Sequence, residues 1–161
     1  MNNFLLAILL SMSPISELRG GIPFILSVSE FNLSNSIMLP LVCIIANMLV
    51  VLLVFFFLDF LHHRLVHFRY YKKIFDFFVL RIQKKARKLK PQIDAYGYLA
   101  LAVFVAVPLP MTGAWTGALI SWLLDLDRKK SFFAIALGVF AAGIIVTAIT
   151  LASMGILRIF S

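Results

Sequence analysis

Glu17 and Arg19 are ionisable side chains in an otherwise apolar N-terminal region, and together they could bind or exchange a charged cargo. They lie two residues apart within Ser13–Pro23, a run rich in serine, glycine and proline (SPISELRGGIP). An ionisable residue inside a bilayer costs from about 3 to more than about 10 kcal/mol unless it is paired or hydrated, so it marks a functional site by default. We expect Glu17 to respond to a proton or cation and Arg19 to hold an anionic group. The alternative is that the two pair with each other and, with Ser13 and Ser16, satisfy backbone groups freed by the turn.

A second run of helix-breaking residues, Val107–Gly117 (VPLPMTGAWTG), repeats this design without a charge. Its prolines are expected to end an incoming helix, and a new helix is expected to begin near Ala114. In the first run a new helix is expected to begin at about Ile22, because Pro23 suits the first helical turn. The free N–H groups and the positive dipole end of each helix would then face a shared site that favours phosphate or carboxylate groups.

The expected substrate-binding residues all come from these two runs. Glycines are included because they permit close approach and positive φ, and the hydroxyl and indole groups because they form hydrogen bonds. Packing between the two runs is the alternative role for the tryptophan and the threonines. The set is Glu17, Arg19, Gly20, Gly21, Pro23, Pro108, Pro110, Thr112, Gly113, Trp115, Thr116 and Gly117.

The composition predicts an integral membrane protein. Hydrophobic residues make up 62% of the 161 residues and the mean hydropathy is +1.01, whereas the apolar share of an ordinary soluble domain is roughly 45–50%. A spanning helix needs about 20 apolar residues, which 37–61 and 131–156 provide. The apolar arms around the two runs are shorter, so residues 4–28 and 98–124 are expected to enter the membrane and return as re-entrant hairpins.

The expected fold is therefore all-α, and its two halves are related as an inverted repeat. Each half is a re-entrant helical hairpin followed by a transmembrane helix, and because a hairpin returns to the side it entered from, the second half starts on the opposite face. We expect one membrane domain over residues 1–161. It divides into repeat 1 at 1–61, a basic amphipathic linker at 62–95, and repeat 2 at 96–161.

The distribution of lysine and arginine indicates the orientation. These residues concentrate in the linker and at 128–130, and the positive-inside rule places both groups on the cytoplasmic side of the cell (plasma or inner) membrane, with both termini on the other side. The linker is expected to form a helix in the headgroup plane that ends at Pro91 and either gathers anionic lipid or only anchors the topology. Nucleic acid is not an expected partner, because membrane topology accounts for the basic charge. The apolar face of this helix comprises Phe68, Tyr71, Phe75, Phe78, Ile82 and Leu89.

One spacing could suit a metal ion. Asp59, His63 and His67 recur every four residues and would share a helical face, but neither a cysteine nor a ligand from a second helix accompanies them. Histidines at the interfacial end of a span, together with His62, are the preferred interpretation. No metal or cofactor is expected, and an enzyme is the least favoured class because the chain has no Walker-type loop, cofactor fingerprint or catalytic triad within the apolar segments.

The two runs resemble the signature segments of the putative small multidrug export protein family, in the sequences ELRGGIP at 17–23 and VPLPMTGAWTGALI at 107–120. That family is similar, more distantly, to the DedA and VTT superfamily. The more distant likeness implies paired re-entrant hairpins and the movement of phospholipids or polyprenyl phosphate across membranes. Residues 107–124 hold none of the arginines that DedA-like proteins carry in their second hairpin region.

These observations favour a secondary transporter or lipid translocase that moves a small amphipathic or phosphate-bearing substrate between the two hairpin tips. The same site could instead export a hydrophobic cation neutralised by Glu17. A protein that organises lipid without transport is the alternative class. A homodimer is plausible because two spans and two hairpins have little bulk to enclose a pathway.

Overall fold

The computed structural model describes residues 2–29, 32–61, 69–109 and 112–159, and within these ranges the chain forms seven α-helices and no strand. The prediction of an all-helical protein is confirmed. The helices are α1 (Asn2–Met12), α2 (Glu17–Val28), α3 (Leu33–Phe56), α5 (Arg69–Tyr96), α6 (Tyr98–Ala106), α7 (Ala114–Leu123) and α8 (Arg128–Ile159), and a π-helical turn, η1 (Phe57–Leu61), extends α3.

Two helices are long and apolar enough to cross a membrane, as predicted. They cover Ser34–Phe60, 27 residues, and Arg128–Gly155, 28 residues. The first helix begins where the Asn32 side chain accepts a hydrogen bond from the Asn35 amide at 2.7 Å. Both helices keep large apolar side chains on their outer faces, including Ile37, Leu49 and Phe56 on α3 and Phe133, Leu137 and Ile149 on α8.

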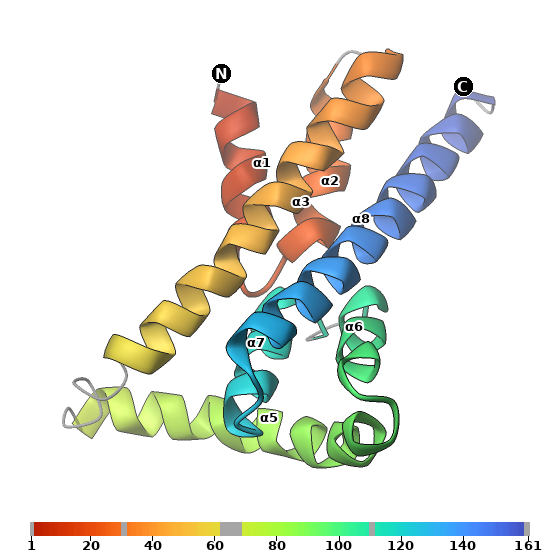
Figure 1. Ribbon diagram of the computed structural model, residues 1–161. Coiled ribbons are helices and arrows are strands. Elements are labelled where there is room, and N and C mark those ends of the chain that lie inside the picture. The colour runs from red at the N-terminus through yellow and green to blue at the C-terminus, as the bar shows by residue number, and fades with distance from the viewer. Residues whose placement is uncertain (1, 30–31, 62–68, 110–111, 160–161) are drawn as a thin grey trace.

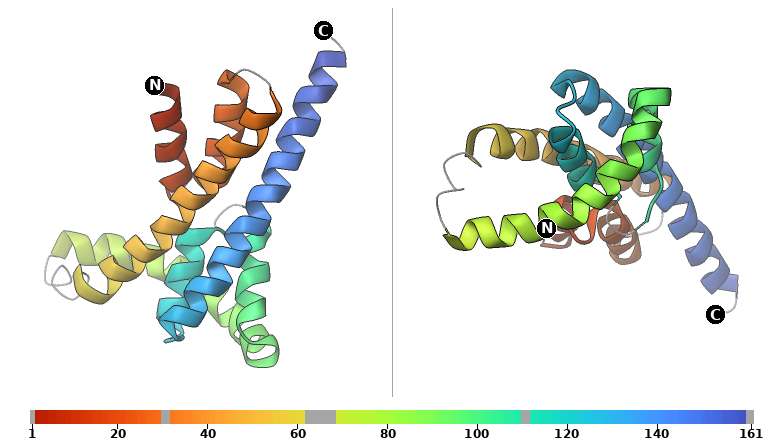
Figure 2. Two further views of the ribbon diagram at one scale, coloured as in Figure 1. Left: turned by 45° about the horizontal axis from the view of Figure 1, so that its top comes forward. Right: turned by 90° about the horizontal axis from the view of Figure 1, so that it is seen from below.

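The short helices form two pairs that approach the middle of the molecule from opposite ends (Figure 1). The α1–α2 pair enters from the end that holds both chain termini, and the α6–α7 pair enters from the end where α5 lies. α2 and α7 both contact α3 and α8, so the long helices position the turns of both pairs. Figure 2 shows α5 crossing the molecule beneath the other helices, where it contacts α6 and α7.

α5 is amphipathic, as the linker pattern predicted. The predicted end of this helix, at Pro91, is wrong. Ile82, Ala86, Leu89 and Ile93 are buried on one face, whereas the intervening lysines are mostly exposed. The helix continues to Tyr96 with Pro91 inside it. Pro91 leaves the carbonyl of residue 87 without its helical donor, and both residues are exposed, so water can hydrate that carbonyl. Of the remaining predicted face, Phe68 and the side chains of Tyr71, Phe75 and Phe78 lie outside the described part of the structure.

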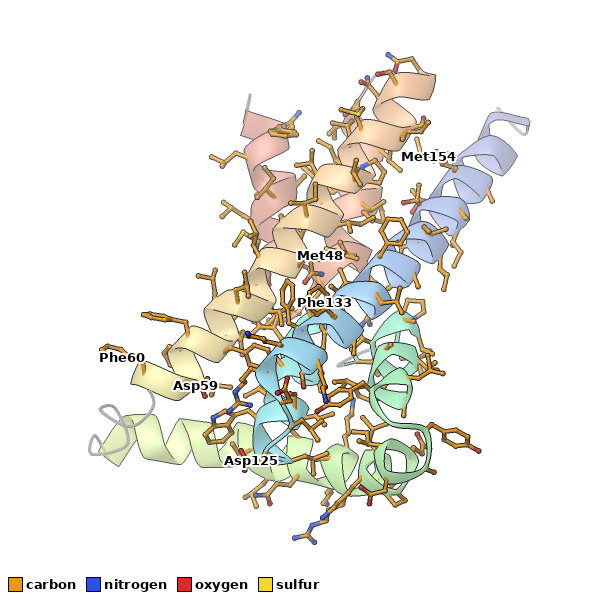
Figure 3. All side chains as sticks on the ribbon, in the orientation of Figure 1. Met48, Asp59, Phe60, Asp125, Phe133 and Met154 are labelled. Carbon is orange, nitrogen blue, oxygen red and sulfur yellow. The ribbon has the colours of Figure 1, made fainter. Side chains whose placement is uncertain are left out.

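An ion pair joins the end of α3 to the start of α8. Arg128 donates from Nε and Nη2 to the two carboxylate oxygens of Asp59 at 3.1 and 3.0 Å, and its guanidinium lies 5.4 Å from the centre of the Phe55 ring. In Figure 3 the neighbouring Phe60 projects away from the helices. Asp59 therefore has a partner other than a metal ion, and the described residues contain no cluster that could hold one. His62, His63 and His67 lie outside the described residues.

Small residues let α8 approach its neighbours closely. Ala134, Gly138 and Ala142 are all buried, and a Cβ on Gly138 would collide with the backbone carbonyl of Ala102 and with Val105. The stripe of small residues therefore packs against α6.

Candidate functional site

The turns of the two helix pairs are joined to each other by hydrogen bonds. The indole N–H of Trp115, at the start of α7, donates to the backbone carbonyl of Met12, at the end of α1, at 2.9 Å. The backbone N–H of Trp115 donates to Glu17 Oε1 at 3.4 Å. We call this meeting point the tip junction, defined by Met12, Glu17, Gly113 and Trp115. It brings the two runs of helix-breaking residues together although they lie about a hundred positions apart in the chain.

Glu17 occupies the first position of α2 in an unusual backbone conformation. Its φ is +47°, in the left-handed region that residues other than glycine rarely adopt. The turn before it is held by Ser16, whose hydroxyl donates to the Leu10 carbonyl at 2.6 Å, and by Ser13, which accepts from the Ile15 amide at 3.4 Å. Strained conformations of this kind persist only where the surroundings impose them, and they cluster at functional sites.

The predicted helix start at about Ile22 is wrong, because α2 begins at Glu17 and contains Pro23. Pro23 cannot donate to the carbonyl of Arg19, so the helix has one hydrogen bond fewer near its start. Gly21 lies inside this helix, and its role there is close packing rather than a turn. A Cβ there would collide with the Ser11 hydroxyl and the Ala7 carbonyl, so glycine lets α1 and α2 pack closely.

The Glu17 carboxylate caps the N-terminus of α7. A Cβ added to Gly113, the residue that precedes α7, would overlap the carboxylate group, so glycine is required there for Glu17 to approach. Free N–H groups and the helix dipole stabilise a negative charge at this position. The anion site expected at the start of α7 is therefore already filled by a carboxylate of the same chain.

A small cavity borders the tip junction. Its volume is about 20 Å³, enough for roughly one water molecule. Glu17, Arg19, Pro108 and Gly113 line it together with Asn47 of α3. No cargo larger than water fits while the turns are in contact.

Asn47 is a site residue that the sequence analysis did not identify. Its side chain is 1% exposed, and its Oδ1 has no hydrogen-bond partner. A buried oxygen without a donor is costly, so such a group favours a bound water or ligand nearby. The signal in the sequence was an isolated polar residue inside an apolar span, which deserves a functional hypothesis when it faces other helices.

The other predicted site residues that the structure describes do not line the cavity. Thr112 braces the second turn, because its hydroxyl lies 2.6 Å from the Val107 carbonyl and 2.7 Å from that of Leu109. Thr116 and Gly117 are buried within α7, and Gly117 packs against Val105 and Ile135. Gly20 faces Ser16. Pro110 lies outside the described residues. An ion pair between Glu17 and Arg19 does not occur in the described structure, where Asp59 and Arg128 form the salt bridge.

The apolar surface and the two long apolar helices indicate a helical membrane protein. Residues 17–145 match the sequence profile of the family described as "Putative small multi-drug export protein", and the chain belongs to that family. The resemblance inferred from the two runs is thus confirmed, and the matched region starts at Glu17 itself. The family implies a membrane transport role and a transporter rather than an enzyme. Searches of curated proteins and of solved structures gave no match.

Proposed function

We propose that this protein is a membrane transporter of the secondary type that moves a small amphipathic or phosphate-bearing substrate through the tip junction. The observation that carries this proposal is the Glu17 carboxylate seated at the N-terminus of α7, where it lines a small cavity together with Arg19 and Asn47. Ionisable residues, helix termini and unwound backbone meet in this way at the binding sites of transporters.

In this proposal Glu17 acts as an internal competitor for an anionic substrate. Ionised, it is attracted by the first N–H groups and the dipole of α7. Uptake of a proton removes that attraction, and the carboxyl group can leave. The N-terminus of α7 and the guanidinium of Arg19 are then available to a phosphate or carboxylate of the substrate. Proton binding and substrate binding are coupled because both act on one position.

A second candidate is the export of a hydrophobic cation. The burial of Glu17, which is 7% exposed, favours it, because a cation that entered the junction could neutralise the carboxylate. The two candidates differ in what they require of Arg19. A positive side chain attracts an anionic substrate and repels a cationic one.

The test is transport in sealed proteoliposomes with Arg19→Gln, and with Arg19→Lys as the control that keeps the charge. The probes are a fluorescent phosphatidylglycerol, whose movement between leaflets is measured by chemical quenching, and ethidium. We expect Arg19→Gln to slow the movement of the anionic probe about tenfold, since a hydrogen bond to a charged group is worth about 1.5–3 kcal/mol. Faster ethidium export with unchanged lipid movement would support the second candidate instead. If neither probe responds to Arg19→Gln, Arg19 has no place in the site.

The same proposal includes an inverted repeat with α5 in the cytoplasm, both termini on the other side, and a homodimer as the working unit. The opposed entry of the two helix pairs and the basic residues of α5 support it. With Cys43 replaced by alanine, cysteines at two exposed polar positions, Asn32 just before α3 and Lys129 at the start of α8, test the topology. Membrane-impermeant thiol reagents should reach the two positions from opposite sides. Labelling of both from one side would rule out the inverted arrangement.

A further inference from the structure

A wide open surface lies away from the tip junction, between α5 and the second helix pair. Two adjoining grooves have volumes of about 550 and 610 Å³. They share Gln92 of α5, Phe104 of α6, and Leu109 and Thr112 of the turn before α7, so they form one continuous surface, which we call the α5 groove. Binding sites for small molecules usually measure about 300–1,000 Å³.

The α5 groove is basic at one end and apolar at the other. Lys85 and Lys88 line the basic end, and Leu99, Val103 and Val107 line the apolar end. Neither part is lined by an aspartate or a glutamate among the described residues. The surface is therefore complementary to a molecule with a negative head and an apolar tail.

Positive charges from two parts of the chain come close at the basic end. Burial lowers the pKa of the Lys85 ammonium, and the nearby guanidinium of Arg19 lowers that pKa further. An anion placed beside Lys85 would offset this repulsion. The basic end thus also adjoins the side chain that borders the cavity of the tip junction.

We propose that the α5 groove binds one anionic phospholipid of the surrounding bilayer. Lys85 and Lys88 hold its phosphate, and one acyl chain lies along Leu99, Val103 and Leu109. A bilayer lipid is the occupant because apolar residues exposed on α6, such as Leu99 and Val103, continue the groove onto the outer surface. A basic helix at the headgroup level attracts anionic lipid with about 1 kcal/mol per lysine. This lipid site does not depend on the transport proposal.

Lipid binding to the purified full chain in detergent tests the charge. Native mass spectrometry compares phosphatidylglycerol with phosphatidylcholine of the same acyl chains. We expect the wild type to prefer phosphatidylglycerol. The double variant Lys85→Gln, Lys88→Gln should bind phosphatidylglycerol about 25-fold more weakly, because each lysine contributes about fivefold. Its affinity for phosphatidylcholine should not change. The control is Lys129→Gln with Lys130→Gln, two exposed lysines at the start of α8 that line no part of the groove.

A substitution that fills the groove tests its position. Leu109→Trp should weaken binding of both lipids about tenfold, whereas Leu137→Trp, at a comparably exposed site on α8, should leave binding unchanged. Equal affinity of the wild type for the two lipids would overturn the proposal. So would a loss with the lysine variants but none with Leu109→Trp, because the lipid would then lie elsewhere on α5. A dimer that Leu109→Trp converts to a monomer, with lipid binding unchanged, would instead assign the groove to a second copy of the chain.

Discussion

Replacement of Glu17 by glutamine is expected to reduce transport about ten- to hundredfold while the protein remains folded. Glutamine keeps the size of the side chain and can still accept the hydrogen bond from the Trp115 amide. It cannot gain or lose a proton, and it lacks the charge that α7 attracts. A hydrogen bond to a charged group is worth about 1.5–3 kcal/mol, and a loss of that size lowers a rate or an affinity about ten- to hundredfold. The measurement is the movement of the fluorescent phosphatidylglycerol between the leaflets of proteoliposomes, with and without an imposed pH gradient.

Two further variants separate the role of the charge from its position. Glu17→Asp keeps the charge but shortens the side chain by one methylene group, so it should retain a response to the pH gradient at a reduced rate. Asp59→Asn removes a carboxylate that is half-exposed and pairs with Arg128, and it should leave transport nearly unchanged. If Glu17→Gln keeps both the rate and the response to pH, Glu17 is not the coupling residue.

Gly113→Ala is expected to destabilise the protein by about 1–3 kcal/mol, the usual cost of an extra methyl group in a filled space. The φ of Gly113 is −89°, which alanine adopts without difficulty, so the cost comes from the collision with the Glu17 carboxylate. The measurement is the thermal unfolding midpoint in detergent. Gly155→Ala is the control, because nothing lies within 4 Å of a Cβ at that position.

The collision predicts a specific coupling between the two residues. In the double variant Glu17→Ala, Gly113→Ala, the new methyl group has room, so most of the destabilisation caused by Gly113→Ala alone should disappear. Effects that simply add would mean that the carboxylate does not lie against Gly113.

The helices of this protein could be predicted from its sequence because segment length and apolar content decide them. Residues 37–61 and 131–156 are long and apolar enough for spanning helices, and α3 and α8 occupy them. The start of α7 at Ala114 was also predicted, since prolines cannot continue the preceding helix. The helix start predicted from Pro23 and the helix end predicted from Pro91 were both wrong, because the chain tolerates one missing hydrogen bond inside α2 and α5.

The contacts of the tip junction could not be predicted, because they depend on how distant segments pack. The sequence identified Glu17 and Gly113 separately, as a buried charge and as a flexible turn residue. Only the three-dimensional structure shows that position 113 must be glycine because the Glu17 carboxylate lies against it. Asn47 illustrates the same limit. Its position in an apolar span was evident, but which neighbour its side chain would face depends on the rotation of α3.

The proline within α2 has a mechanical consequence for the charged end of that helix. Residue 23 supplies no N–H to the carbonyl of Arg19, so the turn that carries Glu17 and Arg19 is bonded less firmly to the rest of the helix than an ordinary first turn would be. Bending between this turn and Ile25 costs less than bending elsewhere. A bend at this point would move Glu17 and Arg19 together, and it would have to displace Leu18, which lies between them and is buried in the core.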